Sequence, residues 1–129
     1  MKSDVFVDTN VLMYAAGGKH PLRSEARDFF RLSVREEMSL ATSAEVLQEL
    51  LHAYLPVGRT EHLDRALALA EGRIGTVWDV EQDDVLLARR LADRLPALDA
   101  RDLLHVACCR RREVTRVKTF DRALEGALG

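Results

Sequence analysis

The sequence lacks any apolar run that approaches the ~18 residues needed to cross a bilayer. Its first residues also do not combine a basic start, a long apolar stretch and a small-residue cleavage site, which is the pattern of a secretion signal. Cysteine is scarce, and Cys108 and Cys109 are neighbours, so they cannot join distant parts of the fold through a disulfide bond. These absences predict a cytoplasmic protein with no membrane association.

The sequence also lacks an excess of basic residues, because 19 Lys and Arg stand against 21 Asp and Glu, a formal net charge of -2. Domains that hold nucleic acid over a broad basic surface usually carry a strongly positive balance, so any contact with nucleic acid must be local. The run of three arginines at residues 110–112 is ordinarily a solvated helix end, although arginine also pairs well with phosphate.

Internal repeats, low-complexity tracts and linkers are absent as well. With 129 residues, of which 47% are hydrophobic, the chain can fill one core without disulfides or a structural metal. We therefore expect residues 1–129 to form a single domain.

Strand-like and helix-like patterns alternate along the whole chain. The predicted strands are residues 5–7, 38–42, 74–80 and 114–119. The predicted helices are residues 11–16, 24–37, 44–55, 60–72, 83–95, 99–112 and 121–128. This alternation predicts an α/β fold in which helical crossovers join parallel strands and cover both faces of the sheet.

Asp8 follows the first predicted strand, and ligands of open parallel sheets bind beyond the carboxyl ends of the strands. Asp4 begins the same strand, roughly 13 Å away at ~3.3 Å per residue, so it belongs to the opposite edge. The ordinary role of Asp8 is to cap the next helix, a role that Thr9 and Asn10 also suit. Asp8 is therefore a candidate for a site, for a cap, or for both.

Asp102 falls between Val106 and Cys109 on a helical wheel, within a helix that is apolar almost all round. A carboxylate in such surroundings needs a partner. With Asp99 as the N-cap, capping and the helix dipole explain Asp102 only in part. Asp121 also lies just beyond a predicted strand and before a helix, so both a cap and a site role are open to it.

Glu49 lies on the polar flank of a helix that Ser43 can cap, and its spacing does not distinguish it from Glu45. Both glutamates are solvated by default.

Carboxylates that crowd together raise one another's pKa, so a shared acidic site is costly unless a cation neutralises it. No cysteine or histidine stands at metal-ligand spacing, and oxygen-only ligation selects Mg2+ or Mn2+ over Zn2+. His105 is interpreted either as an ordinary helix-face histidine or as a residue that orients a site carboxylate.

Four segments together resemble the PIN-domain family, and specifically its small VapC-like toxin nucleases. They are VFVDTNVLMY, TSAEVLQELL, DARDLLHVA and VKTFDRAL, in that order and at compatible spacing over nearly the full chain. The resemblance selects Glu49, six residues after Ser43, over Glu45. It implies a metal site with the ligands Asp8, Glu49, Asp102 and Asp121, supported by Thr9, Asn10, Ser43 and Thr119.

The same resemblance implies a three-layer α/β/α sandwich around a mainly parallel sheet. It also implies an Mg2+- or Mn2+-dependent endoribonuclease with an RNA substrate, and a toxin of a type II pair whose antitoxin blocks the site. We further expect a homodimer, because the second and third helices carry apolar residues beyond the needs of one small sheet face, namely Phe29, Phe30, Leu51 and Tyr54.

The same residues bear on three other functions. A phosphoaspartate receiver domain needs paired acids after its first strand, and a haloacid-dehalogenase-like phosphatase needs a second aspartate at the position of Asn10. Here the first strand ends in Asp8, Thr9 and Asn10, which suits neither. A PIN-domain protein that acts in RNA processing or as an inactive binding scaffold remains the alternative, although a scaffold does not need the four acids that this chain retains.

Overall fold

The computed structural model describes residues 4–128 and contains one parallel sheet. Its strands are β1 (Val5–Val7), β2 (Leu40–Ser43), β3 (Thr76–Trp78) and β4 (Arg116–Lys118), in the order β3-β2-β1-β4. The chain runs outward from β1 to β2 and β3, and then crosses back to place β4 on the other side of β1. The reversal makes the carboxyl end of β1 the switch point of the sheet, which is where ligands bind in open α/β folds.

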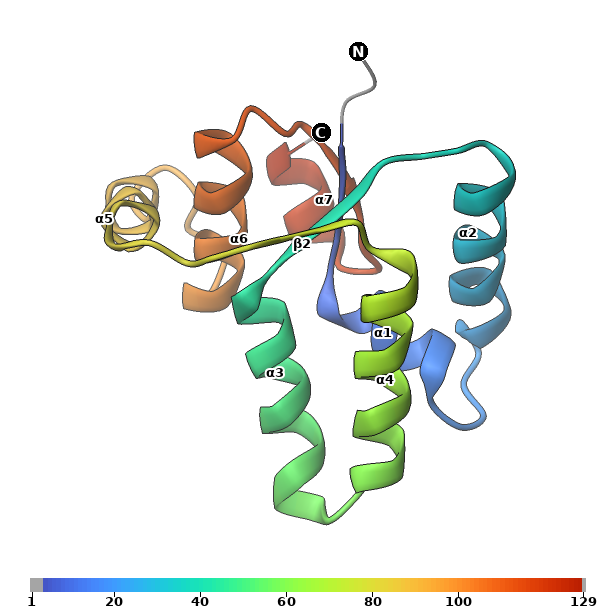
Figure 1. Cartoon of the computed structure of the whole chain (residues 1–129). Helices are drawn as coiled ribbons and strands as arrows, with labels where there is room; N and C mark the ends of the chain where they lie inside the picture. The colour runs from blue at the N-terminus through green and yellow to red at the C-terminus, as the bar shows by residue number, and fades with distance from the viewer. Residues whose placement is uncertain (1–3, 129) are drawn as a thin grey trace.

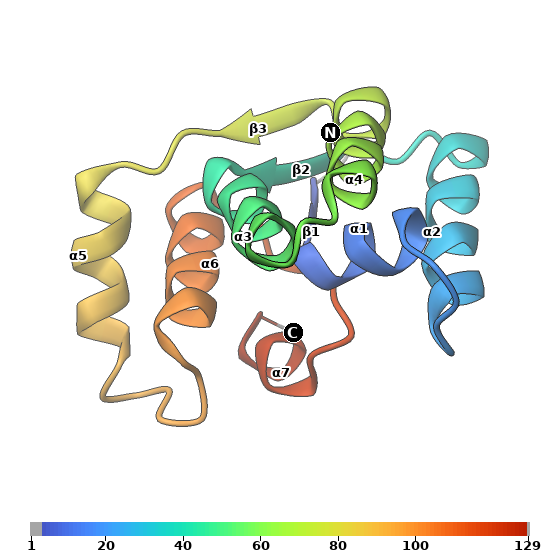
Figure 2. The ribbon, with the colours of Figure 1, turned by 90° about the horizontal axis from the view of Figure 1, so that it is seen from below.

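Seven α-helices flank this sheet among the described residues, in two groups (Figures 1 and 2). Helices α1 to α4 pack on one another, with α1 against both α2 and α4, whereas α5 to α7 form a second group around α6. The prediction of a three-layer α/β fold with a parallel sheet is thereby confirmed. The bounds are α1 (Thr9–Ala16), α2 (Arg23–Arg35), α3 (Ala44–Tyr54), α4 (Thr60–Arg73), α5 (Gln82–Leu91), α6 (Ala100–Arg111) and α7 (Arg122–Leu128), with a 3-10 turn, η1 (Leu55–Val57), after α3.

The centre of the sheet is buried on both faces, which explains the unbroken apolar run of β1. Phe6 in β1 is fully buried and stacks on Trp78 of β3 with 5.8 Å between the ring centroids. One hydrophobic cluster joins β1 and β2 to helices α1 to α4, and a second joins α5, α6 and α7. The first cluster fixes the place of β1, and with it the place of the residue that follows.

Several predicted elements differ from the structure at their ends. The helix predicted for residues 83–95 ends at Leu91, and Pro96 disfavours helical geometry at the residue before it. The strands predicted for residues 74–80 and 114–119 shorten to three residues each, because β3 and β4 are the edges of the sheet and pair on one side only.

The expected surplus of apolar residues on α2 and α3 is mostly absent. Phe30 and Tyr54 are buried in the core of one chain, and Phe29 packs against that core. Of the four residues named, Leu51 alone is an exposed large hydrophobic residue, at 39%. This basis for a homodimer is therefore wrong for three of its four residues.

None of the helices within residues 4–128 has the length and hydrophobicity of a membrane span.

Candidate metal centre

A pocket of about 330 Å3 opens beyond the carboxyl end of β1. All four predicted acids line it, together with Thr9 and Asn10, whereas Ser43 and Thr119 do not. The pocket wall carries five carboxylates and one arginine, and the complete lining is Asp8, Thr9, Asn10, Met13, Glu49, His52, Ala53, Asp99, Arg101, Asp102 and Asp121.

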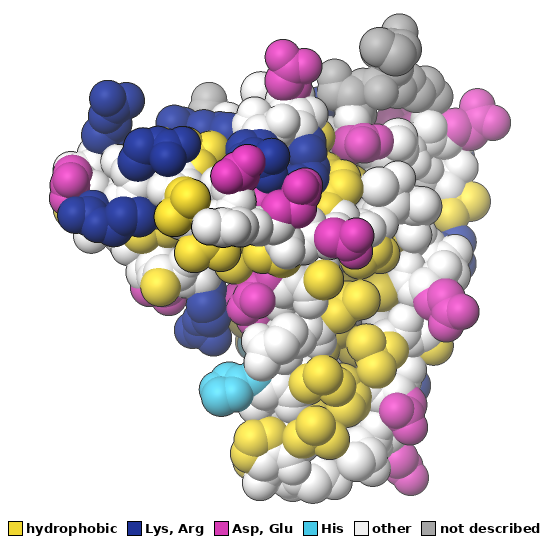
Figure 3. All heavy atoms as spheres, turned by 60° about the vertical axis from the view of Figure 1, so that its left-hand side comes forward, with side chains coloured by type: hydrophobic (Ala, Val, Ile, Leu, Met, Phe, Trp, Pro, Cys, Tyr) yellow, Lys and Arg dark blue, Asp and Glu magenta, His cyan; other side chains and the backbone are white. Residues whose placement is uncertain are grey.

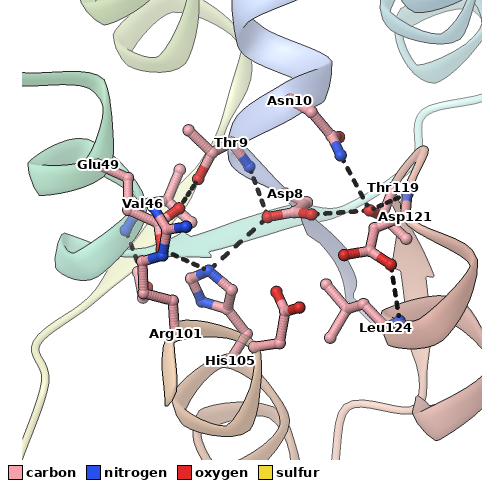
Figure 4. A network of polar contacts seen from close by, with 12 residues as sticks. Asp8, Thr9, Asn10, Val46, Glu49, Arg101, His105, Thr119, Asp121 and Leu124 are labelled. Carbon is pink, nitrogen blue, oxygen red and sulfur yellow. Dashed lines mark hydrogen bonds and ion pairs between the residues drawn. The ribbon is translucent and has the colours of Figure 1, made fainter. Parts of the chain in front are cut away.

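Asp8 lines the pocket and also caps a helix. It is 6% exposed and ends β1, and its Oδ1 accepts a hydrogen bond from the backbone N–H of Thr9 at 2.8 Å as the N-cap of α1. Its Oδ2 accepts from the hydroxyl of Thr119 at 2.7 Å (Figure 4). Burial raises the pKa of Asp8 despite the lowering effect of His105 and of these hydrogen bonds. A nearby cation would stabilise the ionised form of this buried carboxylate.

Glu49 reaches the same place from α3. The Thr9 hydroxyl donates to its Oε2, and the His105 Nε2–H donates to its Oε1 at 3.1 Å (Figure 4). Burial alone would raise the pKa of Glu49, but the hydrogen bond and charge of His105 lower it overall. Glu45, one turn earlier, lines a different pocket with residues of α5 and α6. The geometry thus distinguishes the two glutamates, which the spacing could not.

His105, on α6, lies close to both of these acids. It is 1% exposed on α6, and its Nε2 also lies 3.7 Å from Asp8 Oδ1. Ligand atoms of Asp8, Glu49 and His105 lie within 4.8 Å of one another, which is close enough to surround a metal ion, but the Nε2–H of His105 is engaged with Glu49. Burial lowers the pKa of His105, but the hydrogen bond and charge of Glu49, with the charge of Asp8, raise it overall. Of its two interpretations, the orienting residue is the one that fits this geometry.

Asp102 faces the pocket from the first turn of α6. Asp99 is the N-cap of that helix, and its Oδ1 accepts from the backbone N–H of Asp102 at 2.9 Å, so the carboxylate of Asp102 is not the cap. Burial, followed by the charges of Asp99, Asp121 and Asp8, raises the pKa of Asp102 to about 7. The part of this shift that comes from the neighbouring carboxylates would be offset by a bound cation.

Asp121 combines capping with its place in the pocket wall. Its Oδ1 accepts from the backbone N–H of Ala123 at 2.9 Å, at the start of α7. The Thr119 hydroxyl joins the two sides of the site, because it donates to Asp8 and accepts from the Asn10 side chain at 3.3 Å and from the Asp121 N–H at 3.0 Å. Thr119 therefore couples β1 to the start of α7.

Ser43 is the N-cap of the helix that carries Glu49. Its side chain accepts from the backbone N–H of Val46 as the N-cap of α3, at 3.4 Å. Ser43 fixes the start of the helix that carries Glu49 and does not line the pocket.

The donor set fits a divalent metal ion. Carboxylate oxygens dominate the pocket, and the one cationic side chain that lines it, Arg101, lies 3.7 Å from Asp99. Hard divalent cations prefer such oxygen ligands and would relieve the repulsion that raises the pKa of Asp102.

Comparison with known proteins agrees with this geometry. The profile of the PIN domain family matches residues 5–127. Ribonuclease VapC23 of Mycobacterium tuberculosis is 56% identical over 123 residues, which cover 95% of this chain and 97% of that protein. VapC ribonuclease Mb1869c of Mycobacterium bovis is 34% identical over 125 residues, or 97% of this chain and 95% of that protein.

Two solved structures share the fold at 20% sequence identity. VapC20 of Mycobacterium tuberculosis, described as a Sarcin-Ricin loop cleaving toxin, superposes with a TM-score of 0.80 and covers 96% of this chain and 95% of its own. VapBC2 from Rickettsia felis, bound to a DNA fragment from their promoter, superposes with a TM-score of 0.71 and covers 95% and 91%. With its sequence matched from β1 into α7, the chain belongs to the PIN domain family.

Proposed function

We propose that the protein is an Mg2+- or Mn2+-dependent endoribonuclease and the toxin of a type II toxin-antitoxin pair. The observation that carries this proposal is the meeting of Asp8, Glu49, Asp102 and Asp121 around one pocket. Close relatives named ribonucleases support RNA as the substrate. An inactive scaffold would have no use for this concentration of carboxylates, which destabilises a fold that binds no cation.

The site residues divide into those that would hold the ion and those that hold the ligands. Asp8 and Asp102 would bind the ion, with Glu49 and Asp121 bound directly or through water. When bound, the ion would lower the pKa of a water molecule and polarise the scissile phosphate.

Hydrogen bonds within the chain hold the carboxylates of Asp8 and Glu49 in place. Thr119 and the Thr9 N–H fix both oxygens of Asp8, while His105 and the Thr9 hydroxyl fix both oxygens of Glu49. Carboxylates held in this way are arranged before a ligand arrives, so little ordering entropy is lost on binding.

The test is cleavage of single-stranded RNA with Mn2+ by the variants Asp8→Asn and Asp102→Asn. Each keeps its shape but loses a ligand charge, so we expect the rate to fall by two or more orders of magnitude. Asp93→Asn is the matched control, because Asp93 is an exposed aspartate outside the pocket, and it should cleave at the normal rate. Normal cleavage by the Asp102 variant would contradict the assignment of this site.

We propose that the partner antitoxin inserts a cationic side chain into the acidic pocket. An arginine would replace the charge of the metal and pair with two carboxylate oxygens at once, so inhibition is direct competition. Neutralising each Arg and Lys in the partner's tail should abolish inhibition in a cleavage assay. Undiminished inhibition by the fully neutralised tail would refute this.

We also propose a homodimer in the cytoplasm. Its interface is assigned to an apolar stripe at the end of α3 and in η1, because Leu51 and Leu55 lie one turn apart and, with Val57, are 39%, 52% and 64% exposed. Figure 3 shows hydrophobic side chains gathered at this lower end of the molecule. A reducing compartment suits Cys108 and Cys109, which are free thiols.

A further inference from the structure

Three aromatic side chains form a row that begins at the acidic pocket and leads away from it. They are Phe120, Tyr14 and His20, and we refer to them as the aromatic row. The rings of Tyr14 and Phe120 are 5.6 Å apart at 40°, and those of Tyr14 and His20 are stacked at 3.9 Å and 11°. His20 is exposed, whereas Phe120 and Tyr14 are half-buried.

Phe120 connects the aromatic row to residues that line the acidic pocket. Phe120 lies between Thr119 and Asp121 in the chain, and its N–H donates to Asn10 Oδ1 at 3.3 Å. Tyr14 lies one turn after Asn10 on α1, and it follows Asp8 by six residues, about 9 Å along the helix at 1.5 Å per residue. That distance corresponds to about three stacked bases at 3.4 Å each. The aromatic row thus stands within a few nucleotides of the acids.

A tight turn after α1 holds His20 in its stacked position. Gly17 ends the helix, and a Cβ there would lie 2.7 Å from the Met13 carbonyl oxygen, so another residue would shift the turn. His20 Nδ1 accepts a hydrogen bond from the Leu22 N–H at 3.0 Å. The imidazole is therefore fixed before any ligand binds, and little entropy would be lost on stacking against it.

The hollow beside the row has the opposite charge to the acidic pocket. Lys19, Arg59, His20 and His62 line it with Tyr14 and Tyr54, and no carboxylate does. Met13 lines both hollows, so the two adjoin. Among the described residues, a cationic and aromatic hollow thus adjoins an acidic pocket, in a chain with a net charge of -2.

We propose that the aromatic row is a stacking subsite for a base of single-stranded RNA, with Lys19 and Arg59 paired to the adjoining phosphates. Proteins that bind single strands combine aromatic faces for bases with cations for the backbone, and both are present here. The acids repel the phosphates of a strand, so attraction next to the pocket compensates for that repulsion. This subsite rests on the proposed function, because it names the side of the pocket along which the RNA lies.

The experiment measures binding rather than cleavage. The full-length Asp102→Asn protein is titrated with a fluorescent single-stranded RNA and with versions that carry one abasic site at successive positions. His20→Ala in that background should weaken binding about tenfold. His20→Phe keeps an aromatic face and should bind nearly as the parent does. One abasic position should weaken the parent about tenfold and leave the His20→Ala protein unaffected, because the two changes remove the same contact.

The contribution of Lys19 and Arg59 is measured by the salt dependence of RNA binding. Lys19→Gln and Arg59→Gln should each reduce the slope of log affinity against log salt by about one. Arg90→Gln, an exposed arginine on α5, should leave the slope unchanged.

Parental affinity in His20→Ala, or the same abasic penalty at every position in the parent and in His20→Ala, would overturn the stacking subsite. A chain that binds with the expected pattern but cleaves no RNA would overturn the proposed function and leave the subsite standing.

Discussion

His105 is the residue on which the arrangement of the acids depends most. Its ring is buried against Phe6, with 5.3 Å between centroids, and its Nε2 faces both Asp8 and Glu49. Its Nδ1 is buried and has no hydrogen-bond partner among the described residues. A buried donor that meets two carboxylates holds them at a fixed separation, which is the function of residues that orient metal ligands.

His105→Leu should weaken Mn2+ binding by about 10- to 100-fold, because Glu49 loses the donor that fixes it. Titration calorimetry on the full chain measures this directly. His105→Gln can place an amide donor near the position of Nε2 and should recover much of the affinity. Equal Mn2+ affinity in the leucine variant and the parent would show that His105 only fills space.

Asp102 should make the metal-free protein less stable as the pH rises. Its pKa is about 7 in the fold and 3.8 when unperturbed, so the folded state holds the proton more tightly. Stability is therefore lost between pH 4 and pH 7, and Asp102→Asn removes this loss. Because Asp102 is only half-buried, we expect a gain of at most about 2 kcal/mol above pH 7.

Thermal melts in the presence of a chelator measure this difference. The melting temperature of the Asp102→Asn protein should exceed that of the parent above pH 7. At pH 4 the two melting temperatures should be equal. Asp99→Ala removes the N-cap of α6 instead and should cost about 1 kcal/mol, which Asp99→Ser should largely restore. A lower melting temperature for Asp102→Asn at pH 8 would mean that the carboxylate stabilises its helix.

The roles of several individual residues could not be decided from the sequence. The residue types of Asp8 and Asp121 fit both a helix cap and a site, and in the structure each caps a helix and also lines the acidic pocket. Helix periodicity could not separate Glu49 from Glu45, and the resemblance to PIN domains did. The orienting position of His105 could not be derived, because it depends on contacts between residues 56 apart in the chain. One signal was present, since His105 follows Asp102 by three residues on the same helix face.

At the scale of elements, α5 and α6 are joined by a buried acid. Asp84 is fully buried, accepts from the Glu81 N–H in the capping box of α5, and pairs with Arg111 and Arg112 at 2.8 Å each. These contacts hold the pKa of Asp84 well below its usual range, against the effect of burial. Arg112 also lies 5.0 Å over the Trp78 ring. Two of the three arginines at residues 110–112, which the sequence alone favours as a solvated helix end, thus form ion pairs with a buried acid.

Asp84→Asn should lower the free energy of unfolding by about 3 kcal/mol at pH 7, because it removes the buried charge that pairs with Arg111 and Arg112. Chemical denaturation of the metal-free protein measures this. Since the pKa of Asp84 is lowered by folding, the contribution is present above pH 4 and fades as the pH falls below it. Asp83→Asn is the exposed control and should change stability by under about 0.5 kcal/mol. Equal losses in both variants would contradict a special role for Asp84.

The kinds of elements were predictable, and their ends were less so. Apolar periodicity identified α2, α3 and α4, in which buried residues recur at helical spacing, and Ser43 and Asp99 were identified as caps from their residue types. The edge strands were predicted too long, because alternation in sequence does not reveal where pairing with a neighbour stops.

At the scale of the molecule, the strand order determines where the acids meet. Alternating helices and strands predict parallel pairing but leave the order open, so β3-β2-β1-β4 could not be derived from the sequence. With β4 beside β1, Thr119 comes within hydrogen-bonding distance of Asp8, 111 residues earlier in the chain. Asp8 and Asp121, which follow two adjacent strands, thereby line the same pocket.

The homodimer is expected to form through the apolar stripe at the end of α3 and in η1, because Phe30 and Tyr54 are buried in the core of one chain. Leu55→Lys should convert a dimer to a monomer, because a charge in a small apolar interface cannot be neutralised there. Val34→Lys is the matched control, since Val34 is 54% exposed on α2 and lies outside the stripe. Light scattering at micromolar concentration should show dimers for the parent and for Val34→Lys, and monomers for Leu55→Lys. A parent that is monomeric with and without Mn2+ would refute the dimer, and a dimeric Leu55→Lys would move the interface to another face.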